Sequence, residues 1–176
     1  QQVINLFYES EFKCIICTAD NKIIIKQNQD YIKQGFHLHW PGLYVDITTA
    51  KKIRVSIVTK LQTIYGKRES CYNTWNDIID ECVLDKNGLR LCGSSKGHFR
   101  EGKFIDEKRP YFPSYVMGIS GELDPVELEK LRSSSEYMIR KCSIRTVEEN
   151  ITEVKNLPIG LTEECEECEE YSEISS

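Results

Sequence analysis

Residues 33–41 read KQGFHLHWP, and this stretch decides how the rest of the chain is interpreted. Residues 36–40 are predicted to form a strand that the following Pro-Gly pair ends. Side chains alternate between the two faces of a strand, so His37 and His39 share one face. The stretch therefore predicts a strand that presents two imidazoles side by side.

Two further residues of this stretch suit a phosphate chain. Gly35 leaves room for another group to approach the backbone closely. Lys33 shares the face of His37 if the strand extends back that far. A cation, a gap and an imidazole in line favour phosphate binding. The alternative, favoured on these residues alone, is a half-buried strand with a structural histidine and a solvated lysine.

A carboxylate and a basic segment follow. Asp80 stands between the apolar pairs 78–79 and 82–83, where a buried carboxylate needs a partner or a metal ion; a solvated carboxylate at a helix end is the alternative. Arg90 is placed on a predicted strand, residues 89–92, and Lys96 in the small-residue loop after it. Both cations suit phosphate recognition, although a solvated basic hairpin fits equally well.

The remaining pattern mixes strands and helices and predicts the α+β class with a mostly antiparallel sheet. Strands are predicted at 12–18, 22–26 and 115–119, with a turn at 19–21 between the first two and a tight turn at 87–88. A helix is predicted from a cap at Thr48 or Thr49 to Gly66, with one apolar stripe. Thr74 is predicted to cap a short helix, and Asp124-Pro125 a longer one that ends at about 138–141. Residues 93–113 are predicted to be a loop.

Composition excludes some classes of protein. No apolar run is long enough to cross a membrane, and no signal peptide is recognisable at the start. The net charge of −5 argues against a generic nucleic-acid binder. Seven Glu lie in residues 163–173, however, and without them the charge is about +2 (−5 + 7), which is compatible with phosphate chemistry.

Eight cysteines without a secretory signal favour free thiols in a reducing compartment. The pairs Cys14/Cys17 and Cys165/Cys168 each have the two-residue spacing of zinc ligands. Side chains three apart in a strand face opposite sides, however, and the second pair lies in an acidic tail. Free thiols are therefore expected, and a zinc site from these pairs is not.

Taken in order, the segments around His37, Asp80 and Arg90 resemble the second and third motifs of the archaeo-eukaryotic primase superfamily and the basic strand that follows them. Gly35-Phe36-His37 matches small-x-His, with Gly where Ser is common, and Ile79-Asp80 matches the apolar-Asp motif. The segments 35–41 and 87–90 are especially similar to the primase half of primase–helicases from large nucleocytoplasmic DNA viruses. The resemblance covers roughly residues 10–146.

The resemblance implies a role for each of these side chains. Lys33 and His37 would contact the phosphates of the incoming nucleotide beside Gly35, and Arg90 and Lys96 would hold the triphosphate. Asp80 would bind a divalent ion, Mg²⁺ or Mn²⁺, in two-metal nucleotidyl transfer, which makes His37 and Asp80 the implied catalytic residues. The implied partners are a DNA template, nucleoside triphosphates and a helicase domain, fused or in trans. The expected location is a virus-infected host cell, in a cytoplasmic replication factory or the nucleus.

One departure from the family pattern limits this interpretation. The first motif, Asp-x-Asp, should precede Gly35, but Asp20 and Asp30 stand alone there. Residues 1–146 are therefore expected to be the C-terminal half of the catalytic domain, inactive alone, with the missing half upstream or on another chain. Residues 147–176 are expected to be an acidic disordered tail. The alternative functions are a non-catalytic nucleotide- or nucleic-acid-binding remnant and an interaction module.

Overall fold

A computed structural model of the chain describes residues 3–8, 12–68, 71–85 and 89–143. Its central sheet is antiparallel with strand order β2-β1-β5, formed by β1 (Cys14–Lys26), β2 (Gln29–His39) and β5 (Phe112–Met117). A second, two-stranded sheet pairs β3 (Gly97–Arg100) with β4 (Lys103–Asp106). The predicted α+β class with antiparallel pairing is confirmed.

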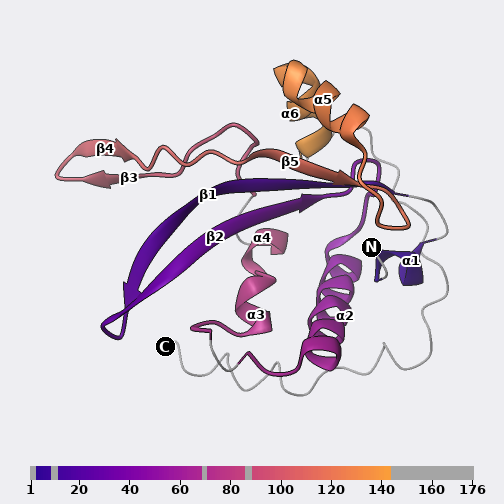
Figure 1. Cartoon of the computed structure of the whole chain (residues 1–176), viewed down its shortest axis with the longest axis horizontal. Helices are drawn as coiled ribbons and strands as arrows, with labels where there is room; N and C mark the ends of the chain where they lie inside the picture. The colour runs from indigo at the N-terminus through magenta and orange to yellow at the C-terminus, as the bar shows by residue number, and fades with distance from the viewer. Residues whose placement is uncertain (1–2, 9–11, 69–70, 86–88, 144–176) are drawn as a thin grey trace.

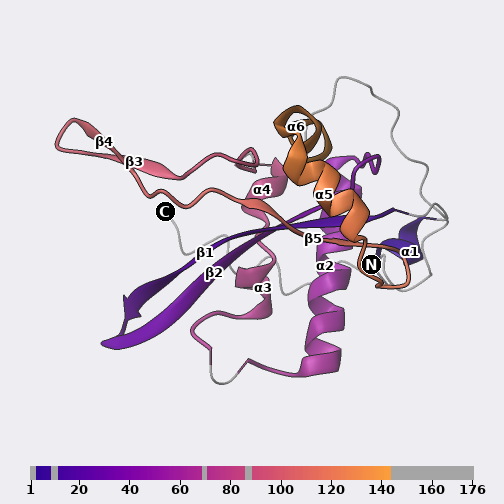
Figure 2. The ribbon, with the colours of Figure 1, turned by 45° about the horizontal axis from the view of Figure 1, so that its top comes forward.

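Helices lie on both sides of the central sheet. Their bounds are α1 (Ile4–Phe7), α2 (Ile47–Tyr65), α3 (Trp75–Ile78), α4 (Cys82–Asp85), α5 (Pro125–Ser133) and α6 (Ser135–Cys142). Helices α5 and α6 lie on one side of the sheet, and α2 and α3 lie on the other (Figure 1). The two hairpins, β1–β2 and β3–β4, extend away from the helices (Figure 2). No described helix is both long and apolar enough to cross a membrane.

The first hairpin differs from the prediction. The predicted turn at 19–21 is wrong, because β1 runs through it and only the pairing register shifts, between Ala19 and Lys22. This bulge absorbs the two polar residues that suggested a turn. The chain reverses instead at Gln27 and Asn28, whose φ angles are 52° and 60°. Positive φ at both positions is the pattern of a type I′ hairpin turn.

The long helix begins earlier than predicted. Asp46, not Thr48 or Thr49, caps α2: its carboxylate accepts hydrogen bonds from the Thr49 backbone N–H at 2.9 Å and from the Thr49 hydroxyl at 2.7 Å. A charged acceptor at the N-cap stabilises the free N–H groups of the first turn. Gly66 ends the helix as predicted, with a φ of 68°.

Two other helix starts are confirmed. Thr74 and Asp77 form a capping box at α3. Asp124 accepts a hydrogen bond from the Glu127 N–H at the start of α5, with Pro125 in the first turn. The single helix predicted after Asp124 is wrong, however, because Ser134 adopts an extended conformation and caps α6 anew.

The segment before β5 also departs from the prediction. Residues 89–92 form no strand, and the predicted loop 93–113 contains the β3–β4 hairpin. The reversal at Glu101-Gly102, both with positive φ, explains the hairpin in a polar segment. β5 begins at residue 112 rather than 115. The predicted turn at 87–88 and the acidic tail lie outside the described residues.

Two hydrophobic clusters hold the fold together. The first joins the sheet to α5 and α6 through residues that include Ile15, Cys17, Val116 and Leu131. The second joins α1 to α2 and includes Phe7 and Ile53. The predicted apolar stripe of α2 is only partly buried, because Ile64 and Tyr65 in its last turn are exposed.

The hairpin turn generates a stability prediction. Replacing Gln27-Asn28 by Asn-Gly is expected to raise the free energy of unfolding by about 0.5 to 1 kcal/mol, because these residues favour positive φ. The control Gln29→Gly, inside β2, should lower it. Urea unfolding measures both changes, and a turn variant no more stable than wild type would contradict this turn geometry.

Candidate phosphate-binding site

The candidate site is organised around an aromatic ring that lies on β2. A Cβ added at Gly35 would lie 2.0 Å from the hydroxyl oxygen of Tyr111 and 2.8 Å from its Cζ. Such contacts are far inside van der Waals distance, so only glycine admits this ring. The space at Gly35 is therefore filled by Tyr111, and a contact of Gly35 with nucleotide stays a prediction.

His37 stacks on the same ring. The His37 and Tyr111 ring centroids are 3.6 Å apart and the planes differ by 12°. Burial, together with the neighbouring His39 and Arg90 charges, lowers the pKa of His37 to about 4. His37 is therefore a neutral imidazole at neutral pH. Its Nδ1 is buried and has no hydrogen-bond partner among the described residues.

Arg90 reaches the same ring from a different segment. Its guanidinium carbon lies 4.8 Å from the Tyr111 ring centroid, within the range of cation–π contacts. The side chain is half-buried, and its Nη1 has no hydrogen-bond partner among the described residues. Two unpaired polar nitrogens, on His37 and Arg90, thus lie at one aromatic ring. An oxyanion accepts hydrogen bonds from a guanidinium, and from an imidazole nitrogen that carries its proton.

Lys33 and Lys96 lie near a common acidic residue. Lys33 is exposed and pairs across the ladder with Lys22, whose ammonium nitrogen is 3.1 Å from the Glu107 carboxylate. The Glu107 backbone N–H donates to the Lys96 carbonyl oxygen at 2.8 Å. The Lys96 side chain is exposed, so both predicted lysines offer ammonium groups to solvent.

Asp80 lies elsewhere. It is exposed between α3 and α4, and its Oδ1 accepts a hydrogen bond from the Cys82 N–H at 2.9 Å. Arg54 of α2 holds this segment by donating to the Ile79 carbonyl at 2.7 Å. α3 lies on the side of the sheet opposite α5 and α6 (Figure 1), whereas His37 faces the core beneath α6. Among the described residues Asp80 makes no bond to His37.

The described residues do not assemble an oxygen site for Mg²⁺ or Mn²⁺. Such ions need several carboxylate or carbonyl oxygens. Within the described ranges, the one group of three or more potential ligands consists of Cys17, His39 and Cys142. Asp80 belongs to no group of three or more potential ligands in that part of the chain, so its catalytic and metal-binding roles remain predictions.

Tyr111 is the residue that sequence reasoning missed. It comes from the segment predicted as a loop, in the run Arg109-Pro110-Tyr111-Phe112-Pro113. An aromatic residue between two prolines carries no signal for contact with a strand 76 residues earlier (111 − 35 = 76). The one available hint was Gly35 itself, which predicted that some group would approach.

Comparison with known proteins gives a family and a viral relative. The family model described as C962R protein N-terminal AEP domain matches residues 1–116. A protein named "Putative helicase 121R", from Invertebrate iridescent virus 3, is 29% identical over 124 residues, which are 65% of this chain and 11% of that protein. The chain thus spans about a tenth of the length of this curated relative. No solved structure matches the chain significantly.

The contact between Gly35 and Tyr111 can be tested by a double-mutant cycle. Gly35→Ala is expected to lower the free energy of unfolding by about 1 to 3 kcal/mol through overpacking against the ring. In a Tyr111→Ala background the same change should cost under about 0.5 kcal/mol, because the clash is gone. The control is Gln34→Ala, an exposed neighbour. Equal losses for Gly35→Ala in both backgrounds would contradict the contact.

Proposed function

The chain belongs to the family of C962R N-terminal AEP domains, and from this premise we propose that it is part of a primase-type nucleotidyl-transfer domain of viral DNA replication. The described residues would hold the triphosphate of the incoming nucleotide. The observation that carries the proposal is the pair of unpartnered nitrogens of His37 and Arg90 at the Tyr111 ring. The similarity to a viral protein with a helicase name supports the replication role.

The arrangement suits a phosphate chain for three physical reasons. Arginine binds phosphate oxygens through several donors in a fixed plane, and the contact with Tyr111 orients that plane. Neutral His37 has one N–H, and it donates to a phosphate oxygen from Nδ1 in the tautomer that carries the proton there. The exposed Lys33 and Lys96 add positive potential at the edge of the site, which raises the local concentration of anions.

A divalent ion belongs to the proposal only for a complete catalytic site. Mg²⁺ or Mn²⁺ would activate a 3′-hydroxyl and steady the leaving pyrophosphate, with Asp80 as one ligand. Asp80 is in no group of three or more potential ligands among the described residues, so no catalytic step follows from them alone. A DNA template, a helicase domain and action within an infected cell complete the proposal.

Nucleotide binding is the first test. Arg90→Ala is expected to weaken binding of a nucleoside triphosphate by about 10- to 100-fold, the equivalent of about 1.4 to 2.8 kcal/mol. Arg90→Lys should recover part of that loss, because it restores the charge without the planar donors. The matched control is Arg140→Ala, an exposed arginine of α6. Titration calorimetry measures the three affinities, and equal losses for Arg90→Ala and Arg140→Ala would refute the site.

Catalysis needs a separate test on the polypeptide as it is encoded in its genome. Primed-template extension with Mg²⁺ or Mn²⁺ is expected, and Asp80→Asn should abolish it while nucleotide affinity stays within about twofold of wild type. Nucleotide binding without any incorporation by the wild-type protein would instead favour a non-catalytic binding module. A metal site that stays incomplete around Asp80 would then explain the result.

A further inference from the structure

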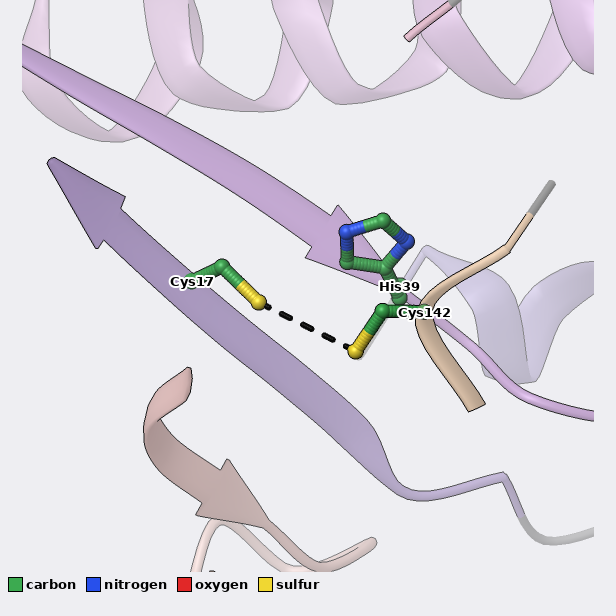
Figure 3. A group of neighbouring side chains, drawn as sticks. All are labelled: Cys17, His39 and Cys142. Carbon is green, nitrogen blue, oxygen red and sulfur yellow. Dashed lines mark hydrogen bonds between the residues drawn. The ribbon is translucent and has the colours of Figure 1, made fainter. Parts of the chain in front are cut away.

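A second group of reactive side chains lies beside the candidate phosphate site. Cys17, His39 and Cys142 converge in the core (Figure 3), and their ligand atoms all lie within 4.8 Å of one another. They come from β1, from the last residue of β2 and from the last residue of α6. All three are buried, with exposed fractions of 0%, 5% and 2%. Water is therefore largely excluded from the space between them.

Cys92 lies next to this group, although its sulfur is not within 4.8 Å of all three of the other ligand atoms. Its sulfur lies 3.5 Å from that of Cys17, and the Cys17 and Cys142 sulfurs are 3.9 Å apart. Zinc–sulfur bonds of about 2.3 Å at tetrahedral angles place two sulfurs about 3.8 Å apart. The two observed separations lie on either side of that value. The Cys92 thiol also donates to the Tyr111 carbonyl at 3.2 Å, so it would turn from that oxygen to bind a metal.

The imidazole of the cluster is ready to bind a metal ion, whereas two of its thiols are protonated. Burial lowers the pKa of His39, which favours the neutral imidazole that binds metals. The Nε2 of His39 is buried and has no hydrogen-bond partner within the described ranges. Within the cluster, hydrogen bonds from Cys142 and Cys17 lower the pKa of Cys92, whereas the pKa values of Cys17 and Cys142 are raised, so those two thiols would give up their protons to the solvent when they bind a metal.

We propose that Cys17, His39, Cys92 and Cys142 bind one structural zinc ion. Three thiolates and an imidazole form a common ligand set of structural zinc, and soft sulfur ligands disfavour Mg²⁺ and Mn²⁺. Four protein ligands leave no open position for substrate, which makes the role structural. Binding releases the protons of those thiols that are still protonated, and neutral histidine releases none.

This set differs from the zinc site considered from the sequence. That site paired Cys14 and Cys17 with Cys165 and Cys168, of which the last two lie outside the described residues. Here Cys17 joins residues that are 22, 75 and 125 positions further along the chain (39 − 17, 92 − 17, 142 − 17). The proposal does not rest on nucleotide binding, because no ligand of the zinc is assigned to the phosphate site.

The direct test is the metal content of the whole chain purified without chelator. Atomic emission is expected to find about one zinc per chain, and Co²⁺ exchanged into the site should show the thiolate charge-transfer band and intense visible absorption of a tetrahedral thiolate complex. A chelator should lower the melting temperature of the wild-type protein by removing a ligand of the native state.

Variants assign the ligands. Cys17→Ser, Cys92→Ser and Cys142→Ser are each expected to reduce zinc content by at least about tenfold. Cys14→Ser, a buried thiol of the same strand, and Cys71→Ser, an exposed one, are the matched controls and should keep the metal. A Cys165→Ser/Cys168→Ser double variant should also keep it.

Several results would overturn the proposal. Wild-type protein without zinc, and without the Co²⁺ spectrum after reconstitution, would show that the cluster consists of hydrogen-bonded thiols only. A mass two daltons lower, restored by reductant, in metal-free protein would show a disulfide instead. Zinc that survives Cys17→Ser but is lost in the Cys165→Ser/Cys168→Ser variant would move the site to the tail. The wild-type measurements hold even if a cysteine variant fails to fold.

Discussion

The absence of a side chain at residue 35 is the constraint on which the site depends. Any larger residue would push the Tyr111 ring away from β2. His37 stacks on that ring, and the guanidinium of Arg90 lies at cation–π distance from it. Three segments that are far apart in sequence therefore meet at one aromatic side chain. Their polar atoms keep unused hydrogen-bonding capacity in a place where burial makes such capacity costly.

The phosphate site and the sulfur cluster share strand β2. His37 faces the ring of Tyr111, and His39, two residues further on, lies beside Cys17 and Cys142. Cys92 and Arg90 are likewise two residues apart in the other contributing segment. A metal ion at the cluster would fix both segments relative to each other, and so would fix the separation of His37 and Arg90. The core on this side of the sheet thus supports the groups proposed to bind phosphate.

Local chemistry was predictable from the sequence, and distant contacts were not. The caps at Thr74 and Asp124 follow from side chains that bond three residues away, and His37 and His39 share a face because β2 is regular. The turn at Gln27-Asn28 lacks the usual glycine. The turn was therefore predicted at the polar residues Asp20-Asn21, which form the bulge. Tyr111 and the cluster around Cys17 depend on tertiary contacts that no spacing along the chain records.

The bulge in β1 has a consequence for association between molecules. β2 is an edge strand, and beyond the bulge the β1–β2 hairpin exposes Ile23, Ile25 and Ile32 at 70%, 71% and 76%. A long, flat, apolar edge of this kind would be a template for strands from other copies of the chain. The bulge between Ala19 and Lys22 increases the local twist of the hairpin. A twisted edge is a poor match for a straight partner strand. The irregularity that obscured the hairpin in the sequence is thus also a protection against aggregation.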